Sequence, residues 1–217
     1  MTPSSQMPKL LPAWRLWAPL LFQTLLIVSI PAQAVYTHLT GKTVTLQTEP
    51  VDPYDLFRGY SITVRYDISR PETLRGLPGW EGLVQQPAGG DLTSLAPGTT
   101  FYVVLEAPAA SALPKSWQPI RVSRDRPLGL PNNQVALKGY ATDGNLQYGL
   151  ESYYIPEDQR NQINGDINQA QQAHQGQHQA QPILVEAKVD AQGHAVPVSF
   201  WVSIGKPPRQ EIRQYRF

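Results

Sequence analysis

Charged side chains that could do chemistry gather in one short stretch, PVDPYDLFRGYSITVRYDIS, residues 50–69. Asp52 and Asp55 supply two carboxylates, and Arg58 supplies a guanidinium just before a strand-like run. Two carboxylates could carry out hydrolysis of the kind that glycosidases perform. A guanidinium beside carboxylates also suits recognition of a ligand or a partner chain. The third interpretation is a rigid turn, stiffened by Pro53 and held by its own ion pair.

A second group of polar and aromatic residues lies in YGLESYYIPE, residues 148–157. Its tyrosines could line a ligand groove around Glu151 or pack in the core with their hydroxyls at the rim. We predict no catalytic residue, metal ligand or cofactor, because no nucleophile stands beside a base in a recognisable pattern. The predicted ligand- or partner-binding residues are Asp52, Asp55, Arg58, Tyr60, Tyr66 and Glu151.

Composition excludes several classes of protein. The 217 residues have a net charge of +1 and show no basic stripe interleaved with aromatics, so we predict no nucleic-acid partner. The 21 prolines disfavour long helices through most of the chain. The chain has no cysteine, which excludes disulfides, thiolate metal sites and a cysteine nucleophile.

An uncharged apolar segment, LWAPLLFQTLLIVSIPAQAVY, occupies residues 16–36. About 20 such residues in a helix span the roughly 30 Å hydrocarbon core of a bilayer. Lys9 and Arg15 precede the segment, which places the N-terminus in the cytoplasm by the positive-inside rule. We therefore predict a single-pass protein with a cytoplasmic tail at residues 1–13, an anchor in the lipid bilayer at residues 14–36 and an extracytoplasmic domain beyond it.

The same segment also resembles a secretory signal peptide. Ala32-Gln33-Ala34 is an A-x-A pattern after an apolar run, so cleavage after Ala34 is the alternative to a retained anchor. The length of the apolar run favours the retained anchor. Both interpretations export the rest of the chain, which predicts an extracytoplasmic location in either case.

From Thr43 onward the sequence alternates between apolar and polar residues in short runs separated by turns, which predicts β-strands. About eight strands at this spacing predict a mainly β domain at residues 41–205, either an antiparallel sandwich or a partly open barrel. The strands are expected at Thr43–Thr48, Ser61–Ile68, Thr100–Ala107, Gln118–Asp125, Gln134–Ala141, Leu146–Ile155 with a bulge at Gly149, Pro182–Asp190 and Ala195–Ile204.

Two insertions interrupt this strand pattern. Residues 75–98 are rich in proline and glycine and are predicted to form a flexible loop. Residues 156–181 begin with Pro156 and acidic residues, which predicts one short helix that gives way to a Gln/His-rich linker. Residues 206–217 form the predicted C-terminal tail.

The stretch at residues 50–69, with GKTVTLQTEP just ahead of it, resembles the signature of the GDYXXLXY protein family. Later blocks are similar to that family at Tyr102–Glu106, Leu137–Ala141 and Tyr148–Glu157, so the resemblance covers roughly residues 41–200. Members of the family are bacterial membrane-anchored proteins, so the resemblance implies an anchor and an extracytoplasmic domain, and it implies no reaction. The matching signature residues are Pro50, Asp52, Pro53, Asp55, Leu56, Arg58, Gly59 and Tyr66.

One part of the signature departs from the family pattern. The Asp-Tyr that follows the glycine in the family is Tyr60-Ser61 here, and the family's leucine is Val64. A role that the family's aspartate has cannot be transferred to this chain, which weighs against catalysis at this turn.

These observations predict a non-catalytic interaction or accessory module of a membrane complex, with a membrane protein as its expected partner. The alternative is an envelope enzyme of the hydrolase type that uses the Asp, Glu and Arg residues near residues 50–66. A further alternative is a structural subunit whose unpaired, uncharged sheet edge pairs with another chain.

Overall fold

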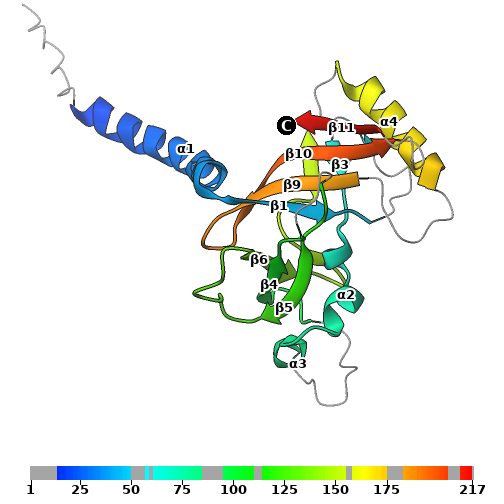
Figure 1. Cartoon of the computed structure of the whole chain (residues 1–217). Coiled ribbons are helices and arrows are strands. Elements are labelled where there is room, and N and C mark those ends of the chain that lie inside the picture. Colours follow the sequence, from blue (N-terminus) through cyan, green and yellow to red (C-terminus); the bar gives the residue numbers. More distant parts are fainter. Residues whose placement is uncertain are drawn as a thin grey trace, which may run out of the picture.

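The fold consists of two four-stranded antiparallel sheets, a small third sheet and an apolar N-terminal helix that extends away from them (Figure 1). The computed structural model describes residues 14–49, 57–58, 61–84, 95–109, 114–154, 158–174, 183–204 and 211–216. The prediction of a mainly antiparallel β domain preceded by an apolar helix is confirmed. No strand pairing joins the two four-stranded sheets among the described strands.

The first sheet has the strand order β1-β9-β10-β11, and all its neighbours are antiparallel. Side chains alternate between the core and the outer face, as the period of two in a strand requires. The β9–β10 hairpin is the one expected from the sequence, and β11 is a strand that the sequence analysis did not include. The strands are β1 (Lys42–Gln47), β9 (Ile183–Val189), β10 (Ala195–Ile204) and β11 (Glu211–Arg216).

The second sheet has the order β5-β4-β6-β7. Its central strands are rich in β-branched and aromatic residues and are largely buried, which is typical of strands with neighbours on both sides. The strands are β4 (Thr100–Glu106), β5 (Gln118–Ser123), β6 (Gln134–Ala141) and β7 (Leu146–Gln147).

The third sheet combines the predicted strands at residues 61–68 and 146–155 in an unexpected way. β3 (Ser61–Thr63) pairs with β2 (Phe57–Arg58) and with β8 (Ser152–Tyr154). The predicted strand at Ser61–Ile68 is therefore shorter than expected, because the chain turns into the 3-10 helix η1 (Asp67–Ser69). The expected bulge at Gly149 is a break, since its φ of +77° turns the chain from one sheet to another.

Three short or medium helices cover the sheets. α2 (Pro71–Arg75) ends at the first residue of the predicted flexible loop at residues 75–98, and α3 (Trp80–Leu83) lies within that region, of which residues 85–94 fall outside the described residues. α4 (Arg160–His174) packs against β10 through Ile163, Ile167 and Ala170. This helix is longer than the short helix expected there.

Both large sheets contribute to one hydrophobic core. Val44 and Leu46 of β1 belong to the same buried cluster as Phe101 and Leu105 of β4. The two sheets are also joined through the backbone, since the N–H of Trp117 donates to the carbonyl oxygen of Thr45 at 2.8 Å. The β body is therefore held by shared burial, which is the main favourable term in folding.

The last turn of α1 (Trp14–Thr40) is built into the β domain. Thr37 is fully buried, and its Oγ1 donates to Oδ2 of Asp190 in the β9–β10 turn at 2.7 Å. The N–H of Gly41 donates to the carbonyl oxygen of Thr37 at 2.8 Å, and a Cβ at Gly41 would meet that oxygen and the backbone nitrogen of Val189. We call this contact between the end of α1 and the Asp190 turn the anchor junction.

Asp190 is the centre of the anchor junction. Its Oδ1 accepts hydrogen bonds from the backbone N–H groups of Gln192 and His194, both at 2.9 Å. Burial alone would raise the pKa of Asp190, but these bonds and the Thr37 hydroxyl together hold that pKa below its ordinary value. Because the pKa is lowered on folding, the stabilisation from ionised Asp190 is present above the unfolded-state pKa and is lost as the pH falls through the lowered value.

Gly139 in β6 tests the packing of this core. A Cβ there would lie 2.7 Å from Cζ of Phe101 and 2.8 Å from Cε1 of Tyr148, two rings that pack edge to face. We predict that Gly139→Ala lowers the free energy of unfolding by about 1–3 kcal/mol through overpacking. The measurement is chemical denaturation of the full-length protein in detergent, followed by circular dichroism.

The matched control is Gly165→Ala in α4. Nothing lies within 4 Å of a Cβ at that position. Alanine in a helix interior is favoured over glycine by about 0.8–1 kcal/mol, so this variant should be more stable than the parent. Equal effects of the two substitutions would contradict the packing described for Gly139.

Candidate functional site

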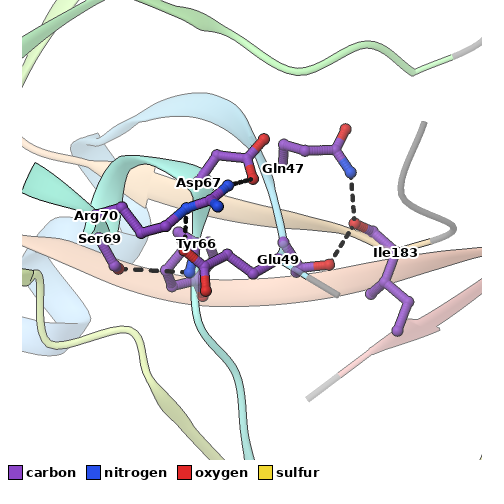
Figure 2. Close-up of polar contacts among 8 residues, drawn as sticks. Gln47, Glu49, Tyr66, Asp67, Ser69, Arg70 and Ile183 are labelled. Atoms are coloured by element: carbon purple, nitrogen blue, oxygen red, sulfur yellow. Dashed lines mark hydrogen bonds and ion pairs between the residues drawn. The ribbon is translucent and has the colours of Figure 1, made fainter. Parts of the chain in front are cut away.

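Two carboxylates and a guanidinium meet at the base of the stretch at residues 50–69, which we call the signature segment (Figure 2). Nε of Arg70 lies 2.7 Å from Oε1 of Glu49, in an ion-pair contact outside hydrogen-bond geometry. An Nη of Arg70 donates to Oδ1 of Asp67 at 3.4 Å. We call Glu49, Asp67 and Arg70 the Glu49 cluster.

Backbone pairing brings the two ends of the signature segment together. Thr48 and Tyr66 form an antiparallel bridge, and the N–H of Glu49 donates to the carbonyl oxygen of Arg65 at 2.8 Å. On the other side, Oγ1 of Thr48 donates to the carbonyl oxygen of Ile183 at 2.9 Å, which ties this point to β9. The signature segment therefore starts and finishes on one fixed base at the end of β1.

The 3-10 helix η1 sets the positions of the Asp67 and Arg70 side chains. The N–H of Ser69 donates to the carbonyl oxygen of Tyr66 at 2.8 Å, and the N–H of Tyr66 donates to Oγ of Ser69 at 3.4 Å. This tight turn places Asp67 and Arg70 three residues apart on one side, as Figure 2 shows. Pro71 at the start of α2 follows directly and fits the first turn of a helix.

Both carboxyl groups of the cluster have a pKa above the ordinary value. Burial raises the pKa of Glu49, whose side chain is 13% exposed, and the nearby Arg70 offsets only part of that rise. Burial likewise raises the pKa of Asp67 against the opposing effect of Arg70. A raised carboxyl pKa means that the ionised form is less favourable in the folded chain than in the unfolded chain. The Glu49 carboxylate is therefore retained at a cost in stability, and such groups concentrate at functional sites.

Buried tyrosines hydrogen-bond to the backbone next to the Glu49 cluster. The hydroxyl of Tyr66 donates to the carbonyl oxygen of Leu150 at 2.7 Å and contacts the hydroxyl of Tyr153. The hydroxyl of Tyr148 donates to the carbonyl oxygen of Ile68 at 2.6 Å. Burial raises the pKa of all three phenols, so they stay protonated and serve as hydrogen-bonding core residues.

The predicted site residues that the structure describes differ in how deeply they are buried. Tyr66 is fully buried, which makes it part of the support beneath the site. Glu151 is half-buried beside it, and its Oε1 accepts a hydrogen bond from the N–H of Tyr148 at 2.6 Å. The backbone of Arg58 pairs with Ser61 in the β2–β3 hairpin.

The remaining predicted residues, Asp52, Asp55 and Tyr60, lie outside the described residues. The ligand-binding role of all six residues stays a prediction. What the structure adds is that the segment containing Asp52, Asp55 and Arg58 starts from the Glu49 cluster.

Sequence reasoning missed Glu49 and Arg70 as site residues. Glu49 immediately precedes the signature segment, and Arg70 immediately follows it. Charged residues of opposite sign at the two ends of a marked segment were the available signal. Among the described residues there is no group of three or more His, Asp or Glu side chains that could hold a metal ion.

The structure combines an antiparallel β domain, a long apolar N-terminal helix and the Glu49 cluster above buried tyrosines. This combination defines a broad class of protein and does not identify a reaction. Within that class, the model of the GDYXXLXY protein family matches residues 23–200, which is most of the chain. The chain belongs to the GDYXXLXY family. No curated protein and no solved structure matches it.

The effect of ionised Glu49 on the free energy of unfolding can be tested directly. We predict that Glu49→Gln stabilises the protein at pH 7 by under about 1 kcal/mol, because the amide needs no ionisation and the Arg70 pair is partly exposed. The gain should shrink as the pH is lowered towards the unfolded-state pKa, where the carboxyl is protonated in both states. The measurement is the free energy of unfolding as a function of pH.

Glu81→Gln on α3 is the matched control, since Glu81 is exposed and lies away from the cluster. It should change the stability by no more than about 0.5 kcal/mol at any pH. Marked destabilisation by Glu49→Gln at pH 7 would contradict this prediction and show that the Glu49–Arg70 ion pair stabilises the fold.

Proposed function

We propose that this protein is a single-pass, membrane-anchored extracytoplasmic protein that acts as a non-catalytic interaction or accessory module of a membrane complex. The observation that carries the proposal is the combination of an uncovered apolar helix with a last turn that is built into the β domain. The first part supplies the anchor, and the second fixes how the domain is presented above the bilayer.

The side chains of α1 favour a bilayer environment. Residues 17–40 are long and apolar enough to cross a membrane, and none of the 18-residue apolar window within them is buried, whereas Thr37 near the end of the helix is buried in the domain. The core helix of a water-soluble protein would be covered on at least one face. Polar groups within the span are satisfied locally, since Oγ1 of Thr24 donates to the carbonyl oxygen of Leu20 and Oγ of Ser29 to that of Leu26. Lys9 and Arg15 precede the uncharged apolar run at residues 16–36, which supports the extracytoplasmic placement of the domain.

A retained anchor fits the anchor junction better than a cleaved signal. α1 continues as one helix through Ala34, and Thr37 is buried in the domain only three residues later. Cleavage after Ala34 would leave that buried turn without the helix that leads into it. This contact supports the interpretation in which residues 14–36 stay attached in the bilayer.

The signature segment is presented at a distance from the membrane. β1 starts beside the end of α1 and leads away from it, as Figure 1 shows, and Glu49 follows two residues after the strand ends at Gln47. At about 3.3 Å per residue, Glu49 lies roughly 23 Å along the strand from Lys42. A rigid base at this height supports recognition of the extracytoplasmic part of a membrane protein, because a pre-organised site loses less entropy on binding.

The two alternatives are less well supported. A structural subunit that pairs through a sheet edge would need an uncharged, unpaired edge, whereas the edge strand β11 contains Glu211, Arg213 and Arg216. The opposite edge strand, β1, begins with Lys42 and already accepts a backbone hydrogen bond at Thr45 from Trp117. A hydrolase-type enzyme is favoured by one observation, the raised pKa of Glu49 and Asp67. The Arg70 guanidinium between those carboxyl groups suits ion pairing more than proton transfer.

The recognition role is tested by affinity isolation of the full-length protein in mild detergent. We predict that Arg58→Ala loses a specific membrane-protein partner that the parent retains, because a guanidinium supplies charge-assisted hydrogen bonds that alanine cannot replace. Arg75→Ala on α2 removes an exposed arginine elsewhere and should keep the partner. Circular dichroism should show that both variants are folded.

Two results would contradict the recognition role. One is an unchanged set of partners in folded Arg58→Ala. The other is hydrolysis of a test substrate by the purified protein that is abolished by Glu49→Gln, which would favour the enzyme alternative.

A further inference from the structure

A cavity lies where α1 enters the β domain. Its volume is about 400 Å³, and three segments line it: the end of α1 with the start of β1, the β5–β6 connection with the start of β6, and the end of β9 with the turn after it. Thr40 and Lys42 come from the first segment, Arg126 and Leu128 from the second, and Asp190 from the third. The cavity therefore adjoins the last turn of the helix that we propose to cross the membrane.

Two cations in this cavity have unused hydrogen-bonding capacity. Nζ of Lys42 donates to the carbonyl oxygens of Asn132 and Gln134, at 2.9 and 3.1 Å. An Nη of Arg126 donates to the carbonyl oxygen of Ala191 at 3.3 Å. An ammonium has three N–H groups and a guanidinium has five, so both retain donors. Within the described part of the chain, neither cation pairs with a carboxylate.

The one carboxylate that lines the cavity is already engaged. Asp190 is 4% exposed, and its oxygens accept hydrogen bonds from Thr37 and from the backbone of the β9–β10 turn. The carboxylate is therefore turned into the anchor junction, while Lys42 and Arg126 are exposed. The accessible part of the cavity is cationic.

An exposed apolar side chain lies on the rim of the same cavity. Leu128 is 77% exposed and sits between Pro127 and Gly129, whose φ of +65° turns the chain. A single exposed leucine is common on protein surfaces, so its position next to two cations is what bears on its role. Beside two cations, it forms the pattern of a segment that rests in a membrane interface, with apolar groups towards the acyl chains and cations at the headgroups.

We propose that this cavity binds the phosphate headgroup of an anionic phospholipid in the leaflet from which α1 emerges. Lys42 and Arg126 bind the phosphate oxygens, and Leu128 inserts among the acyl chains. The inference rests on the proposed membrane anchoring, because the end of α1 is what brings the cavity to the bilayer surface. We refer to the cavity from here on as the headgroup site.

Insertion of Leu128 can be measured with one reporter, since the chain has no cysteine. Leu128→Cys in the full-length protein is labelled with an environment-sensitive fluorophore and reconstituted into phosphatidylcholine nanodiscs with and without phosphatidylglycerol. We expect a blue-shifted emission that is quenched by lipids with nitroxide-labelled acyl chains. The control is Asp143→Cys, in the exposed turn that follows β6 at the opposite end of that strand from the cavity. A label there should be quenched by water-soluble agents and not by the nitroxide lipids.

Headgroup recognition is measured by native mass spectrometry of the unlabelled protein ejected from nanodiscs that contain both lipids. The parent should retain phosphatidylglycerol in preference to phosphatidylcholine. Lys42→Gln and Arg126→Gln should each lower that preference about fivefold, as expected for one cation near an anionic surface. Arg126→Lys, which keeps the charge, should retain most of the preference, and Arg75→Gln on α2 should leave it unchanged.

The outcomes separate this inference from the proposed function. Release of the parent protein from membranes by alkaline carbonate would overturn the anchoring and the headgroup site together. A protein that resists carbonate but keeps the Leu128→Cys label in water, or shows no lipid preference, would overturn the headgroup site alone. Binding of inorganic phosphate or glycerol phosphate by the detergent-solubilised protein, without lipid retention, would also overturn it, because the source of the phosphate would then be soluble.

Discussion

The hydrogen bond between Thr37 and Asp190 is the constraint on which this account depends. It joins residues 153 positions apart and is buried, with a donor–acceptor distance of 2.7 Å. A buried carboxylate is tolerated only when its oxygens are paired, and here the β9–β10 turn and the helix hydroxyl pair them together. The direction of α1 relative to the sheets is therefore set by a polar contact that either element alone would leave incomplete. The proposed placement of the two ends of β1 relative to the bilayer follows from this direction.

With that direction fixed, the two ends of β1 have different roles. The Lys42 end lies at the anchor junction, where the cationic headgroup site opens beside the helix. The Glu49 end holds the base of the signature segment, where a carboxylate is kept although burial raises its pKa. Proteins commonly give up some stability to keep such groups where function needs them. One strand thus separates a surface suited to lipid from a surface suited to a protein partner.

Much of this fold could be predicted from alternating patterns, because a half-buried strand must alternate. β1, β4, β5, β6, β9 and β10 lie where the pattern placed them. The pattern could not show that the strand ends at Thr63 and that a 3-10 helix begins at Asp67, since Val64 and Tyr66 keep the apolar alternation. It also did not show β11, which follows a proline-rich segment and becomes a strand only because β10 offers it an edge.

The candidate site was less accessible to sequence reasoning than the fold. Charge and position marked the signature segment as the unusual region, and the family model covers residues 23–200, which include that segment. Periodicity says which face of a strand a residue occupies, but it does not say what covers that face. For this reason Tyr66 was expected at a binding site and is found fully buried beneath it, whereas Glu49 and Arg70 were overlooked.

The central claim is that α1 and the β domain form one rigid unit, and a distance distribution across the anchor junction tests it most directly. Two cysteines in the otherwise cysteine-free chain, Val28→Cys on α1 and Asp143→Cys after β6, accept nitroxide labels for pulsed electron paramagnetic resonance in nanodiscs. The account predicts one narrow distribution, which broadens when Thr37→Val removes the hydroxyl from Asp190. A broad distribution in the parent, unchanged by Thr37→Val, would show that the helix and the domain are only loosely tethered and would contradict the account.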